Sequence, residues 1–232
     1  MNVAQMLDKS SYSISLGNTH QDGIISSTGM DRYNVKVSAD TKLTNNWSSG
    51  FTANYITTSI DKAVTSGNGL LRTVYAAPPS YDLAGIPSHV DGNPYTQNSF
   101  RGSFDNAYWA MENNKFTEDT NRFFGNVYAS YQTDFGTTNH KLNAKYMVGV
   151  DAYTTHYVDS YGYGSNTGGG RGQIENYGWT NATYNSLLTI NYDWHINEDW
   201  GLNAVVGNEI IQSNRKKYYE YGTNYNFPGW NH

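Results

Sequence analysis

The side chains that could carry chemistry are scattered along this chain, and their spacing matches no catalytic or metal-binding pattern. The sequence has no cysteine, so disulfide bonds and thiolate metal ligands are excluded. Its six histidines include no pair at zinc-ligand spacing. The glycine-rich run 168–172 lacks the Lys-Ser or Lys-Thr of a phosphate-binding loop, and residues 91–93 lack a calcium-ligand series. A flexible loop and a turn are the favoured interpretations, and we expect neither a cofactor nor an enzyme.

Charged side chains lead to the same conclusion. Glu118-Asp119 and Glu198-Asp199 fall in expected loops or turns, where solvated surface is favoured over the paired carboxylates of a glycosidase. Lys141, Lys145 and Asp151 share the polar face of an expected strand. They are either a ladder of charges along a lumen or an ordinary solvated surface, and the sequence does not separate these interpretations.

Aromatic residues are the most distinctive feature, because 21 of the 232 residues are tyrosine and aromatics reach 15%. Aromatic rings bury a large area at a binding surface and can stack on sugar rings. Rings in long loops are therefore candidates for contact with a ligand or a partner, the alternative being that they pack the loops together. The candidates are Tyr81, Tyr108, Trp109, Tyr161 and Tyr163.

The elements that would position these rings are long β-strands. Between Asn121 and Asp151, apolar and polar residues alternate along two arms separated by residues 136–139. Side chains of a strand alternate between its faces, whereas a helix needs apolar residues three and four apart. Each arm exceeds the ~5–6 residues of an average strand and suits the roughly 9–11 residues of a transmembrane strand. The face expected to meet lipid carries Val127, Tyr131, Leu142, Val148 and Val150.

The same period of two predicts five further strands, at 11–18, 33–43, 47–58, 184–194 and 202–215, which makes seven in all. Two segments outside these strands are expected to be short helices. They are residues 1–9 and residues 69–77, the second stopped by Pro78-Pro79.

Connections alternate strictly in length along the chain. Short turns are predicted at 44–46, 136–139 and 197–199, and longer connections at 20–31, 59–120 and 153–179. All short turns then lie at one end of the sheet, as in outer-membrane barrels with short periplasmic turns and long extracellular loops. Aromatic residues flank the short turns, as in an interfacial girdle: Trp47, Phe135, Trp194 and Trp200.

Composition narrows the class of protein. The mean hydropathy of −0.67 and the absence of any apolar run of ~18 residues exclude a helical membrane protein. A barrel is not excluded, because only alternate strand residues face lipid. A net charge of −5 without a basic patch argues against a nucleic-acid partner. Residues 1–10 have neither the basic start nor the apolar core of a signal peptide.

Four stretches, in order, carry a resemblance to a known family. They are residues 12–33 (YSISLGNTHQDGIISSTGMDRY), 77–83 (APPSYDL), 105–109 (DNAYW) and 121–126 (NRFFGN). The chain resembles SusC/RagA-type TonB-linked outer-membrane proteins, the nutrient transporters of Bacteroidetes. The resemblance runs nearly from end to end, but it lacks the family's TonB box, plug domain and closing C-terminal strand. Residues 1–232 are therefore expected to be a partial TonB-dependent receptor β-barrel domain.

The resemblance implies a function, a location and partners. It implies energy-coupled uptake of oligosaccharides or peptides across the outer membrane, with a SusD-like surface lipoprotein above the barrel and TonB acting from the periplasm. Seven strands are an odd number, and plugged transporters have about 22, so the chain would supply roughly a third of the wall. Two alternatives stay open: a soluble or surface-attached glycan-binding β-sandwich, and an adhesin-like structural protein.

Overall fold

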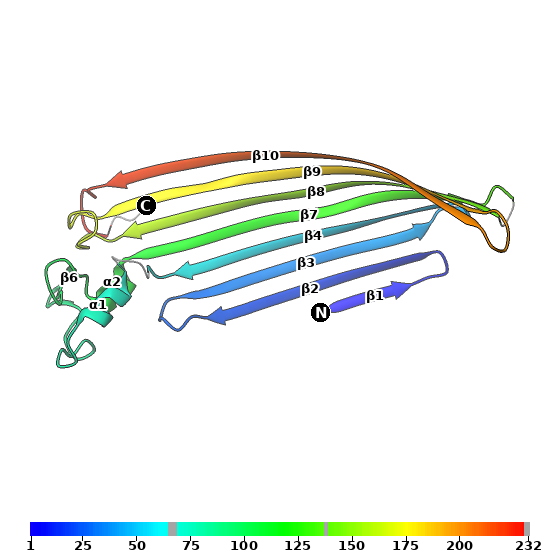
Figure 1. The fold of residues 1–232 in the computed structure, drawn as a ribbon. Helices are drawn as coiled ribbons and strands as arrows, with labels where there is room; N and C mark the ends of the chain where they lie inside the picture. The colour runs from blue at the N-terminus through cyan, green and yellow to red at the C-terminus, as the bar shows by residue number, and fades with distance from the viewer. Residues whose placement is uncertain (65–68, 137–138, 230–232) are drawn as a thin grey trace.

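A single large antiparallel sheet dominates the computed structural model, which describes residues 1–64, 69–136 and 139–229. Its eight strands are neighbours in chain order (Figure 1). The strands are β1 (Asn2–Met6), β2 (Ser10–Asp22), β3 (Gly29–Lys42), β4 (Trp47–Lys62), β7 (Lys115–Thr133), β8 (His140–Tyr161), β9 (Gln173–His195) and β10 (Gly201–Thr223). The sheet is open, since within the described residues β1 and β10 each pair on one side only.

The predicted all-β antiparallel class is confirmed, but the count of seven strands is wrong. The expected helix at residues 1–9 is instead strand β1, which pairs with Ser11–Ser15 of β2 and provides the eighth strand. A weak local preference for helix gives way here, because the backbone of a short segment gains a full ladder of hydrogen bonds on the edge of β2.

Strands β8 and β9 extend well beyond their predicted limits. The connection predicted at 153–179 shrinks to residues 162–172, because β8 continues to Tyr161 and β9 begins at Gln173. Polar residues occur on both faces of these extensions, so the alternation of apolar and polar residues is weak, although Tyr157 and Tyr161 fall on one face of β8. Long-range pairing along the full length, from His140↔Trp194 to Tyr161↔Gln173, fixes them as strands. Tyr161 therefore lies at the end of a strand and not within a loop.

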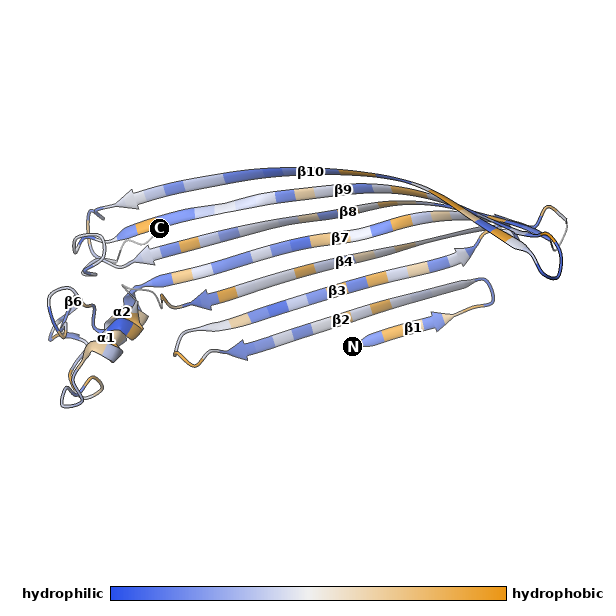
Figure 2. Cartoon of the chain, in the orientation of Figure 1, coloured by the Kyte–Doolittle hydropathy of each residue, from blue (hydrophilic) through white to orange (hydrophobic). Residues whose placement is uncertain are grey.

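Cross-strand register gives the sheet two chemically different faces. One row runs through Ile14, Val37, Ala53, Gly125, Val150 and Tyr184, which are direct partners across successive strands. Figure 2 shows the resulting alternation of apolar and hydrophilic residues along the strands. We call this side the outer face. The five residues expected to face lipid all lie on it, and Val148 and Val127 are 41% and 53% exposed.

The apolar part of the outer face has a defined height, and we call it the outer apolar band. On β8 it runs from Leu142 to Ala152, about 33 Å of strand at ~3.3 Å per residue. A strand tilted by about 40° would cover ~25 Å along the barrel axis, which matches the ~25 Å apolar band of outer-membrane barrels. Beyond Ala152 the outer face becomes polar, in a row through Thr57, Asn121, Thr154, Thr180 and Lys216.

Loops are segregated between the two ends of the sheet, as predicted (Figure 1). Residues 7–9, 43–46, 134–139 and 196–200 connect strands at one end, although residues 137 and 138 of the predicted turn 136–139 lie outside the described residues. Residues 23–28, 63–114 (the first long loop) and 162–172 (the second long loop) lie at the other. At the short-turn end, the rings of Trp47 and Tyr131 meet at 5.0 Å on the outer face.

The described residues of the first long loop form a unit with its own small core. It contains α1 (Leu70–Ala76), α2 (Ala107–Asn113) and a small hairpin of β5 (His89–Val90) and β6 (Asn93–Gln97). Helix α1 matches the predicted helix before Pro78, and neither described helix is long and apolar enough to cross a membrane. Helix α2 was not predicted, and Asn106 caps it by accepting hydrogen bonds from the N–H groups of Tyr108 and Trp109. The core residues are Phe104, Ala107, Trp109 and Ala110.

Candidate functional site

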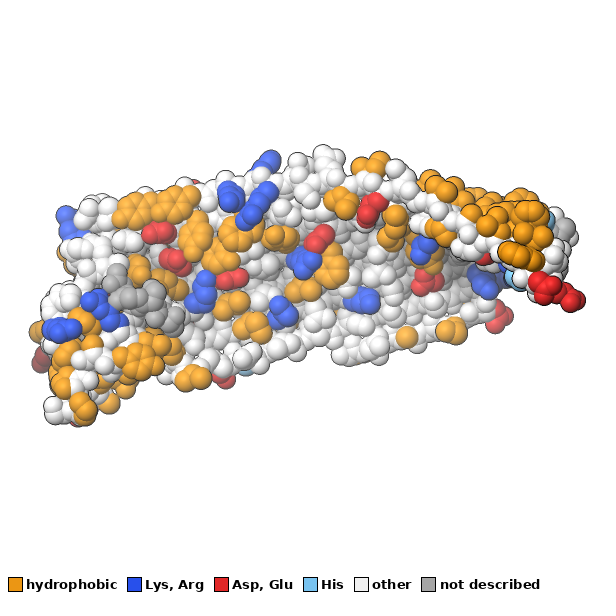
Figure 3. Space-filling view, viewed as in Figure 1, with side chains coloured by type: hydrophobic (Ala, Val, Ile, Leu, Met, Phe, Trp, Pro, Cys, Tyr) orange, Lys and Arg blue, Asp and Glu red, His pale blue; other side chains and the backbone are white. Residues whose placement is uncertain are grey.

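The opposite side of the sheet, which we call the inner face, is mostly polar. Ser15, Lys36, Asn54, Phe124, Asp151, Thr183 and Ser213 form one of its rows. Charged side chains of both signs are distributed over the face turned to the viewer in Figure 3. Because each strand presents apolar residues outward and polar residues inward, the inner face is the side suited to contact with water and polar ligands.

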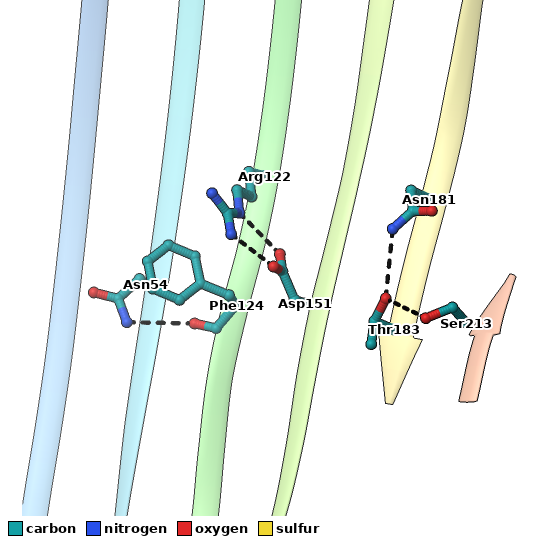
Figure 4. A network of polar contacts seen from close by, with 7 residues as sticks. All are labelled: Asn54, Arg122, Phe124, Asp151, Asn181, Thr183 and Ser213. Atoms are coloured by element: carbon teal, nitrogen blue, oxygen red, sulfur yellow. Dashed lines mark hydrogen bonds and ion pairs between the residues drawn. The ribbon is translucent and has the colours of Figure 1, made fainter. Parts of the chain in front are cut away.

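An ion-pair network occupies the middle of the inner face (Figure 4). Arg122 donates from Nε and NH2 to the two carboxylate oxygens of Asp151, at 2.8 and 2.6 Å, and its guanidinium lies 4.9 Å from the centre of the Phe124 ring. Thr183 shares a hydrogen bond of 2.9 Å with Ser213 on the next strand. Bidentate pairs of this kind are directional, so the network fixes side chains across neighbouring strands.

Of the three charges for which a ladder and a solvated surface were both left open, Asp151 belongs to this network and Lys145 lies over the ring of Tyr128, 4.3 Å from its centre. Tyr128 in turn donates to Asp40 at 2.6 Å. The charges of the inner face are therefore organised by cross-strand contacts, and they do not form a simple ladder along β8.

Towards the long loops, four aromatic rings gather on the inner face. We call Tyr157, Tyr177, Trp179 and Tyr219 the inner aromatic cluster. Tyr157 and Tyr177 are direct cross-strand partners and stack at 4.8 Å with 7° between their planes. Trp179 lies 5.4 Å from Tyr157, and Tyr219 lies 6.4 Å from Tyr177. The cluster lies nearer to the long loops than Thr154 and Thr180, where the outer face becomes polar.

Carboxylates hold the phenol groups of this cluster in place. Tyr177 donates to Asp159 at 3.1 Å, and Tyr219 donates to Glu175 at 3.1 Å. Burial, followed by the charge of Asp159, raises the pKa of Tyr177 to about 12. Burial also raises the pKa of Tyr157, with the charge of Glu118 as the next cause. These tyrosines therefore stay neutral and act as donors at physiological pH.

Two cations of the chain already lie over the rings. Lys62 Nζ is 4.4 Å from the centre of the Tyr157 ring and 3.3 Å from a carboxylate oxygen of Glu118. Arg215 lies 4.8 Å from the centre of the Trp179 ring. The face of an aromatic ring attracts cations through its quadrupole. The two contacts show that Tyr157 and Trp179 each present a ring face to a cation.

The five aromatic residues proposed from sequence are not brought together. Trp109 is 0% exposed and donates from its indole to the carbonyl of Pro94 at 2.8 Å, so it packs the first long loop. Tyr81 meets Phe100 edge-on at 5.1 Å, and Tyr161 meets Phe116 in the same way at 5.1 Å. Tyr108 is 42% exposed on α2, and Tyr163 is half-buried in the second long loop.

The carboxylate of Asp105 is the centre of a hydrogen-bonded junction between the two long loops, to which Gln97 adds a bond to the carbonyl of Gly164. Asp105 accepts hydrogen bonds from Gln97 of its own loop, and from Ser165 Oγ and both the backbone and side-chain N–H groups of Asn166, at 2.6 to 2.8 Å. Gly164, at φ +102°, fits beneath this junction, where a Cβ would lie 2.0 Å from the carbonyl oxygen of Tyr95. The stretch 105–109, chosen for its resemblance, is thus an architectural element that fixes the loops.

The inner aromatic cluster was missed because its residues fell in a predicted loop or beyond a predicted strand. Tyr157 and Tyr177 were assigned to the connection 153–179, and Tyr219 lies past the expected end at Arg215. The spacing of two between Tyr157, Asp159 and Tyr161, and between Glu175, Tyr177 and Trp179, was the available signal.

The fold is that of an antiparallel segment found in solved transporter structures. The RagAB peptide importer in its closed-closed state matches with a TM-score of 0.72 at 16% identity, and the open-open state with 0.74 at 16%. A structure of the RagAB peptide transporter matches with 0.72 at 14%. Each match covers 97% of this chain and 25% of the other, so the chain spans about a quarter of these proteins. No family model and no curated protein sequence matches.

Proposed function

We propose that this chain forms part of the barrel wall of an outer-membrane, TonB-dependent nutrient transporter of the SusC/RagA type. Its inner face would line the lumen, and its two long loops would lie on the extracellular side. The complete protein would take up peptides or oligosaccharides together with a SusD-like surface lipoprotein.

The outer apolar band is the observation that carries this proposal. Large apolar side chains are exposed along it on successive strands, between aromatic residues near the short turns and a polar row near the long loops. Its height of ~25 Å fits the hydrocarbon layer that a tilted strand must cross. A β-sandwich would cover this face with a second sheet, whereas the only other sheet among the described residues is the β5–β6 hairpin. The sandwich and adhesin alternatives are therefore disfavoured.

Solved structures with a similar fold, together with the polar inner face, support the proposed substrate and partner. The matching structures are named as peptide importers, which favours peptides over oligosaccharides as the cargo. The lipoprotein would contact the exposed surface of the first long loop, where Tyr108 and Tyr81 lie. Outer-membrane lipid would contact the outer apolar band. TonB would contact other parts of the complete protein.

Site-directed labelling tests the orientation. The chain has no cysteine, so single cysteines at Asp91 and Gly169 report on the two long loops, and one at Asp199 reports on a short turn. In intact cells producing the complete protein, a membrane-impermeant maleimide should label positions 91 and 169 but not 199. Position 199 should react only after the outer membrane is breached. Labelling of 199 alone in intact cells would invert the orientation and remove the basis for the proposal.

A further inference from the structure

We infer that the inner aromatic cluster binds the ammonium group of a peptide, an inference that rests on the proposed role in peptide uptake. The cluster was not assigned a role above, and its chemistry selects one class of group. The proposed occupant is the free amino terminus of a short peptide, seated over the stacked Tyr157–Tyr177 pair.

The location of the cluster favours contact with cargo. All four rings are on the inner face. In a closed barrel, a further strand would pair with the free edge of β10 through its backbone and would leave the inner face uncovered. Tyr219 on β10 is 62% exposed. The rings lie beyond the level of the outer apolar band, so they face the mouth through which cargo would enter.

The chemistry of the cluster favours a cation. The ammonium group of Lys62 lies over the face of the Tyr157 ring, in the position that the ammonium group of a peptide would take. Three carboxylates border the rings. Glu118 lies beside Tyr157 as its cross-strand partner, and Asp159 and Glu175, themselves partners, lie two residues further towards the long loops. Asp159 and Glu175 accept hydrogen bonds from the phenol groups of Tyr177 and Tyr219. The rings are therefore already fixed, and binding does not have to order their side chains.

The opposite border of the cluster has the opposite charge. Lys217 is the direct partner of Trp179, and Arg215 lies over the Trp179 ring. Four residues of strand separate Glu175 from Trp179 on β9, which is about 13 Å at ~3.3 Å per residue. An extended peptide of about four residues has the same span. Such a peptide would place its amino terminus at the carboxylates and its carboxylate at the basic border.

Binding of two matched peptides tests this inference. The probes are a neutral tetrapeptide of alanine and leucine with a free amino terminus, and its N-acetylated twin. Both are titrated calorimetrically against the complete protein in detergent. We expect the free-amine peptide to bind about 5- to 30-fold more tightly, the range that corresponds to a cation–π contact in a partly desolvated site. Equal affinities would overturn the inference, as would competition by a neutral oligosaccharide with no preference for the free amine.

Variants separate binding from folding. Tyr177→Ala should abolish the preference for the free amine, whereas Tyr184→Ala, on the same strand but the outer face, should leave it intact. Lys62→Met removes the internal competitor and should tighten binding of the free-amine peptide several-fold, a direction that a merely structural role would not produce. Weaker binding in Lys62→Met would contradict the inference. The labelling of cysteines at positions 91 and 169 from outside the cell does not depend on peptide binding. Failure of the binding inference can therefore be distinguished from failure of the proposed function.

Discussion

A lysine placed at Val148 should impair folding of the complete protein far more than a lysine at the adjacent Met147. The two residues are neighbours in β8 and face opposite sides of the sheet. Val148 pairs with Val127 and lies on the outer face, whereas Met147 pairs with Tyr128 and lies on the inner face. The pair therefore tests one property, which face meets lipid, at the same depth along the same strand.

The magnitude follows from the depth of Val148 in the outer apolar band. It lies about 15 Å from the level of Leu142 and ~10 Å from that of Ala152, using ~3.3 Å per residue and a tilt of about 40°. A lysine near the midplane of a barrel costs ~2–4 kcal/mol, which is a factor of roughly 30 to 900 in the folding equilibrium. At Met147, the aliphatic stem of lysine replaces most of the lost contact, and we expect a cost below ~1 kcal/mol.

Equilibrium refolding of the complete protein into lipid vesicles would measure both variants, with the folded fraction read from heat-modifiable mobility in gels. Val148→Lys should shift the unfolding midpoint strongly, and Met147→Lys slightly. Equal shifts, or a larger shift for Met147→Lys, would refute the assignment of the outer face to lipid.

The 232-residue chain produced alone should require detergent, because its outer face and the edge of β10 are uncovered; a monodisperse, detergent-free monomer with a cooperative melt would argue for a sandwich. Asp105→Ala leaves the fully buried Ser165 hydroxyl without its acceptor and should destabilise the paired loops by ~1–3 kcal/mol, seen as faster proteolysis in the first long loop. Asp82→Ala is the control, because the Asp82 carboxylate accepts a hydrogen bond from Gly85 of the same loop. Equal proteolysis rates for both variants would contradict the joining role of Asp105. Finally, the pKa of Tyr177 is raised from 10 to about 12. The hydrogen bond of its neutral phenol therefore stabilises the fold fully below pH 10, and this stabilisation is lost as the pH rises through 12. Phenolate absorbance should show this late titration, and Tyr177→Phe should remove it.

The clear alternation in the central strands made much of the fold predictable. Residues such as Val127 and Val148 alternate with polar neighbours over a long distance, and only a strand with two different faces explains that pattern. Turn residues and loop lengths then placed the short turns at one end of the sheet. Where alternation was weak the prediction failed, as at residues 1–9 and in the extensions of β8 and β9.

The candidate site could be predicted only in part. Aromatic richness pointed to rings as the active surface, yet Trp109 packs the first long loop while Tyr157 and Tyr177, not proposed from sequence, stack on the inner face. Aromatic residues in a presumed loop carry no information about which ring is buried. That depends on long-range contacts, such as the junction of the two long loops at Asp105.

The strand period, the two faces and the separation of short from long connections can be predicted from the sequence, because these are local properties of neighbouring residues. The register is set only by tertiary contacts, and the register fixes the height of the outer apolar band and the partners of each ring. Register depends on pairings between residues far apart in the chain, such as Tyr157 with Tyr177 and Tyr177 with Tyr219. A shift of one residue would send each of these rings to the other face, so no local pattern could have assembled the cluster.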